Sequence, residues 1–294
     1  MPLWRKQELS FVHAVSTHYR DKRSHFDGQD LLEAGTSALG SGARDGWLNR
    51  MLQQVPGVAA DTAFAIGTTP LPVLEGSAPV ANWAPEANLR LSPQAQRLAA
   101  LVMEEDPALH AALAEAQMLS GAGQDSKGGR AHQQIARYAA ARLRGDARVA
   151  AFSLGGWDTH GVQHRVLPRS LQTLQDSILL LKDGLGDEVW GKTALIAMTE
   201  FGRTARENGA GGTDHGTGGM MILAGGGIKG GQIHARWPGL TEADLYQRRD
   251  LMPTADVRAS AAWIMRGIAG VNRGVLENTV FPGLDMGSDP KLLL

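Results

Sequence analysis

The chain contains no cysteine among its 294 residues, and this absence excludes disulfides, thiolate metal ligands and a cysteine nucleophile. An excess of charge of one sign is also missing, because 29 lysine and arginine residues balance 30 aspartate and glutamate residues. This balance argues against the basic surface of a general nucleic-acid binder. Long hydrophobic runs are lacking too, since runs such as 178–181 and 220–224 are far shorter than the ~20 residues of a bilayer crossing. We therefore expect a soluble globular protein that binds neither nucleic acid nor membrane.

The signatures of three common enzyme classes are absent as well. The sequence has no GxSxG nucleophile elbow, no HExxH helix and no GxxxxGK[ST] phosphate loop. Serine hydrolase and nucleotide-loop functions are therefore disfavoured. The residues after Met1 also lack the apolar core of a secretory signal, so the chain as written is expected to be cytoplasmic.

Glycine is abundant, at 37 residues, but it is concentrated in clusters that predict loops. Between the clusters, the apolar period alternates between that of helices and that of short buried strands, which predicts an α/β fold. We expect one domain over residues 1–294, with a mainly helical part at 1–145 and an α/β part at 146–285.

Individual elements follow from capping residues and apolar periodicity. Helices are predicted at 4–19, 45–54, 92–117 (as two successive helices), 129–143, 167–185 and 257–268. Short apolar runs predict strands, which lie at 61–67, 149–154, 193–199 and 220–224. The glycine-rich segment 225–231 (GGGIKGG) separates the last of these from a further strand expected through His234. A hairpin turn is therefore favoured over phosphate binding for this segment.

Two of the predicted strands end in polar residues. Asp158 and His160 follow the strand at 149–154, and Glu200 and Arg203 follow the next strand along the chain. In open α/β sheets, ligand and catalytic groups collect at the carboxyl ends of strands. Each pair also has an ordinary explanation: the first pair suits an Asx turn and a helix cap, and the second suits a plain ion pair.

A third polar pair, Asp214 and His215, lies within the glycine-rich loop 209–219 (GAGGTDHGTGG), just before the strand at 220–224. Glycine lets the backbone approach an ion or a phosphate closely, and carboxylate and imidazole suit Zn²⁺ or Mn²⁺ where thiolates are absent. The alternative is a mobile surface loop. Because carboxylates and imidazoles recur at the edges of three separate strands, a metal-assisted centre is favoured.

The predicted metal ligands are carboxylates and imidazoles: Asp158, His160, Glu200, Asp214 and His215. They suffice for one closed or two open sites, and two ions could clamp the attacking and leaving oxygens of an ester. Arg203 is the candidate catalytic residue, because a guanidinium can hold the oxygens of an anion. His25 is a weaker candidate, since a lone histidine beside Phe26 is more often packed or solvated. Trp157 and Phe201 are expected to line the pocket of this centre or to pack beneath it.

Several motifs in order along the chain resemble the domain of unknown function 1501 family: RSHFDGQDLLEAG, GGWDTHG, TEFGRT, ENG, GTDHG, KGG and VFPG. That family is similar to the alkaline phosphatase and sulfatase superfamily, which hydrolyses or transfers phosphate and sulfate esters at a divalent-metal site. The resemblance implies an alkaline phosphatase-like layered sheet flanked by helices, with the family's first strand region and its nucleophile missing from this chain. It also implies that a longer natural product with a twin-arginine signal would be periplasmic.

The resemblance also assigns roles to single residues. Asp158 and His160 resemble the superfamily's Asp and His pair at one metal, Glu200 resembles the Asp of its Asp-His ligand pair, and His215 resembles its late metal-binding histidine. The superfamily usually has Asp-x-x-x-His at the first pair, and Phe201 stands where the second ligand histidine is expected. His164 is therefore a candidate substitute.

Two functional hypotheses follow. The first is a metal-dependent hydrolase of phosphate or sulfate esters, which takes a small anionic ester and uses Zn²⁺, Mn²⁺ or Ca²⁺. The second is a truncated or inactive relative that uses the same pocket to bind an anion, a sugar polymer or a partner protein. Loss of the first strand would leave a sheet edge unpaired, so a homo-oligomer or a partner covering that edge is also expected.

Overall fold

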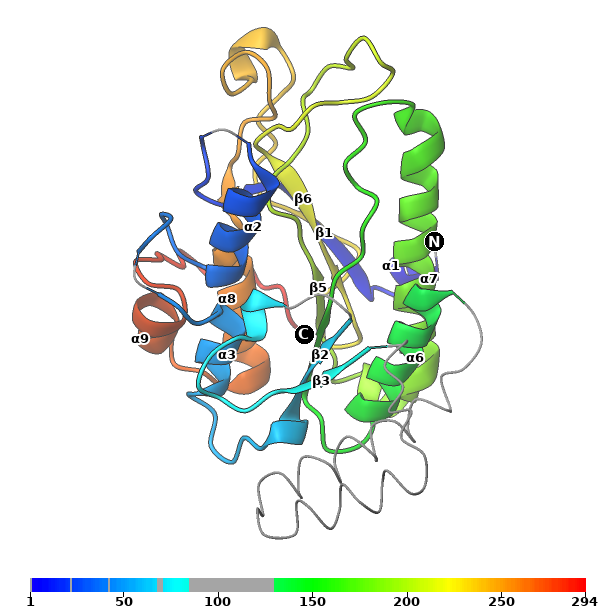
Figure 1. Ribbon diagram of the computed structural model, residues 1–294, viewed down its shortest axis with the longest axis vertical. Coiled ribbons are helices and arrows are strands. Elements are labelled where there is room, and N and C mark those ends of the chain that lie inside the picture. Colours follow the sequence, from blue (N-terminus) through cyan, green and yellow to red (C-terminus); the bar gives the residue numbers. More distant parts are fainter. Residues whose placement is uncertain (1, 22, 42, 68–70, 85–129) are drawn as a thin grey trace, which may run out of the picture.

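The computed structural model describes residues 2–21, 23–41, 43–67, 71–84 and 130–294. Its strands lie between two layers of helices (Figure 1), and the expected α/β class is confirmed. One layer contains α2 (His25–Ala34), α3 (Trp47–Leu52) and α8 (Val257–Ala269). The other contains α6 (Ala131–Leu143) and α7 (Gln163–Trp190). The helical segment expected at 92–117 lies outside the described residues.

The described strands form two sheets. The larger has the order β5-β6-β1-β7, and β8 also pairs with β1. Its members are β1 (Leu9–Ser16), β5 (Leu195–Ala197), β6 (Gly219–Ala224), β7 (Ile233–His234) and β8 (Ala255–Asp256). The smaller sheet is parallel, with the order β3-β2-β4, and contains β2 (Ala63–Ile66), β3 (Ala81–Trp83) and β4 (Val149–Phe152). The four apolar runs predicted as strands are confirmed.

Short elements complete the described chain. They are the helices α1 (Pro2–Arg5) and α9 (Arg273–Val275), the 3₁₀ turns Ala60–Thr62, Pro72–Leu74 and Glu242–Asp244, and the π-helical turn Leu276–Val280. None of the described helices combines the length and the apolar character needed to cross a bilayer.

The helix expected at 4–19 is wrong. After the single turn of α1, the chain enters the left-handed region at Gln7 (φ 57°) and continues as β1 in the interior of the larger sheet. β1 pairs antiparallel with β6 and parallel with both β7 and β8. These partners are distant in sequence, and their hydrogen bonds and burial outweigh a local helix propensity that was only moderate.

The hairpin expected at 225–231 is also wrong. β6 and β7 are not neighbours, because β1 lies between them. The glycine-rich segment instead crosses the end of β1, where the amide of Gly225 donates to Glu8 O and that of Gly230 donates to Gln7 O. A Cβ on Gly230 would lie 2.3 Å from the Gln7 backbone, so this approach requires glycine.

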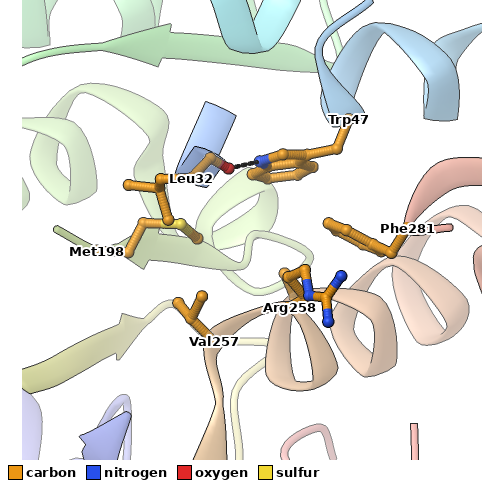
Figure 2. Close-up of a pocket in the computed structure, with 7 residues that line it drawn as sticks. Leu32, Trp47, Met198, Val257, Arg258 and Phe281 are labelled. Carbon is orange, nitrogen blue, oxygen red and sulfur yellow. Dashed lines mark hydrogen bonds between the residues drawn. The ribbon is translucent and has the colours of Figure 1, made fainter. Parts of the chain in front are cut away.

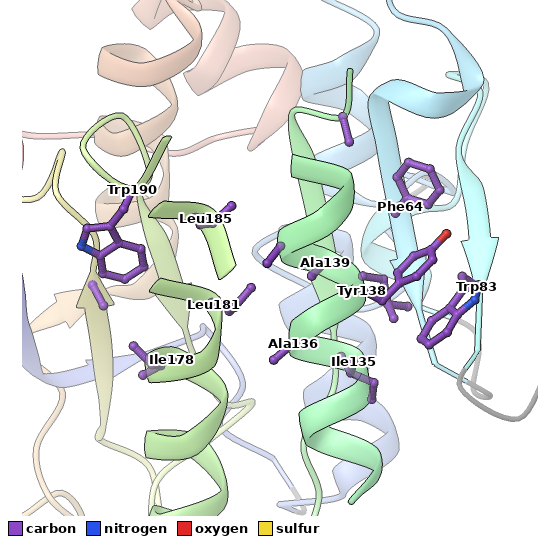
Figure 3. Packing of buried hydrophobic residues seen from close by; sticks show 14 of the residues in the cluster. Phe64, Trp83, Ile135, Ala136, Tyr138, Ala139, Ile178, Leu181, Leu185 and Trp190 are labelled. Atoms are coloured by element: carbon purple, nitrogen blue, oxygen red, sulfur yellow. The ribbon is translucent and has the colours of Figure 1, made fainter. Parts of the chain in front are cut away.

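Alternation along β2 connects the smaller sheet to both helix layers. Phe64 and Ile66 join the core beneath α6 and α7, and Ala63 and Ala65 join the core beneath α3 and α8. Figure 3 shows the first core, in which the Tyr138 ring stacks on Trp83 with centroids 3.8 Å apart.

The second core contains a small packing space between α2, α3 and α8 (Figure 2). It is lined by Leu32, Trp47, Met198, Val257, Arg258, Ala261 and Phe281. Trp47 Nε1 donates a hydrogen bond of 3.0 Å to Leu32 O across it. None of the residues predicted as metal ligands lines this space, so it is a feature of the core.

Candidate metal centre

The polar residues predicted from the strand ends meet at one edge of the larger sheet. Because β6 is antiparallel to both β1 and β5, its amino end lies beside their carboxyl ends. The loop before β6 carries Asp214 and His215, the loop after β5 carries Glu200 and Arg203, and the chain leaving β1 leads to α2. Backbone pairing between Arg203 and His215 joins the first two of these loops.

Three side-chain atoms form a nearly equilateral triangle at this edge. Asp158 Oδ1 lies 2.9 Å from His160 Nε2 and 3.0 Å from His215 Nε2, and the two nitrogen atoms are 2.9 Å apart. The side chains of Asp158 and His160 are each 45% exposed. The triangle is therefore open to a ligand from solvent.

The remaining nitrogen of each imidazole faces an acceptor. His215 Nδ1 lies 2.6 Å from the main-chain oxygen of Arg23, which can only accept a hydrogen bond. His160 Nδ1 lies 3.1 Å from Asp214 Oδ1. Both Nδ1 atoms therefore act as donors, and in a neutral imidazole this leaves the Nε2 lone pair facing Asp158.

His25 extends this arrangement from the first residue of α2. Its Nδ1 lies 2.7 Å from Glu200 Oε1, and its Nε2 lies 3.3 Å from Asp158 Oδ2. Burial alone would lower the pKa of His25, but the two carboxylates outweigh it and raise the pKa. Ser24 caps this helix by accepting from the amide of Asp27, which fixes where α2 begins and hence where His25 lies.

The six residues of this group are here called the Asp158 cluster: His25, Asp158, His160, Glu200, Asp214 and His215. Four of them contribute to the centre, because ligand atoms of His25, Asp158 and His215 lie within 4.8 Å of one another and His160 completes the triangle. Glu200 and Asp214 were predicted as ligands, but their contacts place them behind the imidazoles of His25 and His160.

The carboxyl group of Asp158 is held ionised by its neighbours. Burial would raise its pKa, but the hydrogen bond from Arg203 and the neighbouring imidazoles of His215 and His25 outweigh this effect and lower the pKa to about 2. The bond from Arg203 Nη1 to Asp158 Oδ1 is 2.7 Å long. Asp158 is thus a carboxylate at neutral pH, the form that binds a metal ion.

Polar residues of the surrounding loops fix Asp214 and Arg203. Asn208 Nδ2 donates to Asp214 Oδ1 at 2.9 Å, and this bond, with a further contribution from His160, lowers the pKa of Asp214. Arg203 Nε donates to Thr213 Oγ1, and its Nη2 donates to the main-chain oxygen of the same threonine. Gln163, the first residue of α7, accepts hydrogen bonds from the hydroxyls of Thr159 and Thr213 at 2.6 Å each.

Three other residues considered in the sequence analysis are Phe201, Trp157 and His164. Phe201 is buried beneath the centre, with its ring 5.0 Å from that of His25 and 4.7 Å from that of His215. Trp157 is partly buried and donates to Leu154 O. His164 is exposed on the first turn of α7, and no hydrogen bond or ion pair within the described chain joins it to the cluster.

Sequence reasoning undervalued His25 and did not single out Arg23, Gln163 or Asn208. The local signal for His25 was Ser24, a residue type that favours the N-cap of a helix. The helix wrongly expected at 4–19 hid the strand-to-helix transition on which that signal depends.

The donor set and its spacing fit a divalent transition metal. Neighbouring ligand atoms lie about 3.0 Å apart around an octahedral ion with bonds of about 2.1 Å, and about 3.4 Å apart around a tetrahedral one. The observed edges of 2.9 to 3.0 Å match the octahedral spacing. Three acceptor atoms this close repel one another unless a cation or a proton lies among them.

Comparison with known protein families gives a match. The family described as "Protein of unknown function (DUF1501)" matches residues 10–262, a range that includes the whole Asp158 cluster. No curated protein and no solved structure matches the chain significantly.

Proposed function

The chain belongs to the DUF1501 family, and we propose that it is a metal-dependent hydrolase of phosphate or sulfate esters. The observation that carries this proposal is the convergence of two imidazole Nε2 atoms on Asp158 Oδ1, with edges of 2.9 to 3.0 Å. An alkaline phosphatase-like arrangement of the layers is part of the proposal, since strands between two helix layers are what that resemblance implies.

The chemistry of the donors favours Zn²⁺ or Mn²⁺ over Ca²⁺. Calcium takes six to eight oxygen ligands, whereas imidazole nitrogen suits the transition metals. Asp158, His160, His215 and His25 would hold the ion. When bound, such an ion polarises an ester oxygen and makes a nearby water more acidic.

Arg203 is suited to bind the anionic part of an ester. Three of its five N–H groups are engaged within the described chain, one with Asp158 and two with Thr213. The remaining two N–H groups can donate to oxygens of a phosphate or sulfate group. The bond to Asp158 places these donors next to the candidate metal ligands.

The first test is metal content, measured by plasma mass spectrometry on protein purified without chelator. We expect near-stoichiometric zinc or manganese in the wild type and its loss in the double variant His160→Ala, His215→Ala. The matched control is His164→Ala, which removes an exposed histidine outside the cluster and is expected to retain the metal.

The same proteins are then tested on a panel of phosphate and sulfate esters with Zn²⁺ or Mn²⁺ added. We expect hydrolysis by the wild type and by His164→Ala, and none by the double variant. Absence of metal from the wild type would overturn the proposal. Stoichiometric metal without hydrolysis of any ester would instead favour the binding hypothesis.

A further inference from the structure

A buried carboxylate lies behind the Asp158 cluster and has no role in the chemistry proposed above. The side chain of Asp250 is fully buried. Its Oδ2 accepts from Arg23 Nε at 3.2 Å, Arg23 Nη2 at 3.0 Å and Thr217 Oγ1 at 2.8 Å, and its Oδ1 accepts from Arg249 Nη1 at 3.0 Å. A carboxylate is costly to bury, and complete pairing of this kind offsets the cost.

Both arginines that pair with Asp250 also hold His215. The main-chain oxygen of Arg23 accepts from His215 Nδ1 at 2.6 Å. Arg249 Nη1, the nitrogen that contacts Asp250, also donates to the main-chain oxygen of His215 at 3.1 Å. The Asp250 carboxylate therefore holds two arginines that both contact His215: Arg249 contacts its backbone, and Arg23 contacts its imidazole.

The backbone of Arg23 needs such a restraint. Its φ of 55° lies in the left-handed region, which residues with a side chain adopt rarely. In this conformation, the carbonyl of Arg23 is directed toward His215. The side chain of Arg23 is held by its ion pair with Asp250 and by a hydrogen bond from its Nη2 to Gln247 Oε1.

We propose that Asp250 is a positioning residue for His215. By holding Arg23 and Arg249, it keeps the imidazole in the tautomer with a proton on Nδ1 and directs Nε2 toward Asp158 and His160. The effect on the tautomer stands independently of any ligand, and only the expected effect on metal affinity rests on the proposed function.

The test compares Asp250→Asn and Arg249→Met with the wild type. Arg248→Met is the matched control, because Arg248 is 81% exposed and, within the described chain, its nearest carboxylate is that of Glu242, 3.9 Å away. Nitrogen-15 spectra of selectively histidine-labelled, metal-free protein at alkaline pH report the tautomer, and a His215→Gln spectrum assigns the signal. Competition with a chelator gives the affinity for Zn²⁺, and circular dichroism confirms folding.

In the wild type and in Arg248→Met, we expect a single His215 tautomer protonated at Nδ1. In Asp250→Asn and Arg249→Met, we expect mixed tautomers and Zn²⁺ binding about 10- to 100-fold weaker, the usual effect of losing a residue that orients a ligand. Folded variants that keep the wild-type tautomer and affinity would overturn the proposal, as would a wild type not protonated at Nδ1.

If Asp250→Asn does not fold, Arg249→Met tests the proposal, because the Arg249→Met variant retains the ion pair between Arg23 and Asp250. If the wild type binds no Zn²⁺, the proposed function fails, and the tautomer spectra alone decide the role of Asp250.

Discussion

At the scale of single residues, the acceptor opposite each imidazole Nδ1 decides what the Asp158 cluster can bind. Glu200 lies opposite Nδ1 of His25, Asp214 opposite that of His160, and the Arg23 carbonyl opposite that of His215. All three Nε2 atoms therefore turn toward Asp158. The two additional carboxylates act through the imidazoles they orient, which is how histidine ligands are commonly supported.

Glu33 provides a prediction about pH at the same scale. Burial raises its pKa, although its carboxylate accepts from Gln29 Nε2 at 2.6 Å and from the Val73 amide at 2.8 Å. The folded chain therefore binds this proton more tightly than the unfolded chain does. Proton binding by Glu33 stabilises the folded state fully below the pKa of the unfolded state, and this stabilisation is lost as the pH rises through the pKa of the folded state. Glu33→Gln, which stays neutral, is expected to gain stability relative to the wild type as the pH rises above the ordinary glutamate pKa of about 4.3.

Urea denaturation at several pH values measures this difference. Glu188→Gln is the control, because the Glu188 side chain is 86% exposed, and its stability should follow that of the wild type at every pH. A difference between Glu33→Gln and the wild type that stays constant with pH would contradict the prediction.

At the scale of elements, α7 links the core to the candidate site. Ile178, Leu181 and Leu185 are buried in the first core, as Figure 3 shows, whereas Leu171 nearer the amino end is 45% exposed. The amphipathic stripe expected over 167–185 is thus buried in its carboxyl-terminal part. The first residue of the helix, Gln163, binds the threonine hydroxyls beside the cluster.

The register of β6 gives a matched pair of substitutions at this scale. Met220 and Met221 are neighbours on one strand, and alternation turns them to opposite faces. Met220 is 46% exposed, whereas Met221 is fully buried in the core with Val12 and Leu223. We expect Met221→Ala to lower the free energy of unfolding by about 2 to 5 kcal/mol and Met220→Ala to change it by at most about 0.5 kcal/mol.

Urea denaturation of the two methionine variants checks this expectation. Equal losses in both variants, or a larger loss for Met220→Ala, would show that the register of β6 on β1 differs from the one described.

At the scale of the whole molecule, the centre depends on loops from distant parts of the chain packing backbone against backbone. Gly202 follows β5 and Gly218 precedes β6, and a Cβ on Gly202 would lie 1.8 Å from Gly218 O. The amide of Gly202 also donates to Thr217 O at 3.0 Å, and its carbonyl accepts from the Gly216 amide at 2.8 Å. These contacts hold Arg203 beside His215.

Gly202→Ala is therefore expected to separate the two loops and to lower the free energy of unfolding by about 1 to 3 kcal/mol, as overpacking does. Gly209→Ala in the glycine-rich loop 209–219 is the control, because a Cβ there meets no atom within 4 Å, and its effect should be within about 0.5 kcal/mol. Equal stability of the two variants in urea denaturation would argue against the close approach.

Local sequence patterns predicted the α/β class, the strands of the second half of the chain and the chemistry available at their ends. These properties are local: apolar runs reveal buried strands, and polar residues that follow them are visible in order along the chain. Asp158, His160, Arg203 and His215 were recognised in this way, and the structure brings them into contact.

Three features depend on long-range packing: the position of β1 in the sheet, the path of 225–231 across the end of β1, and the place of His25 in the Asp158 cluster. β1 is a strand because β6, β7 and β8 pair with it, and no local pattern specifies partners more than 200 residues away. The same holds at the centre, where Glu200 and Asp214 lie behind the imidazoles and Asp250 lies behind His215. Which atom of a side chain faces which neighbour is set by packing between loops, and residue type and spacing alone do not determine it.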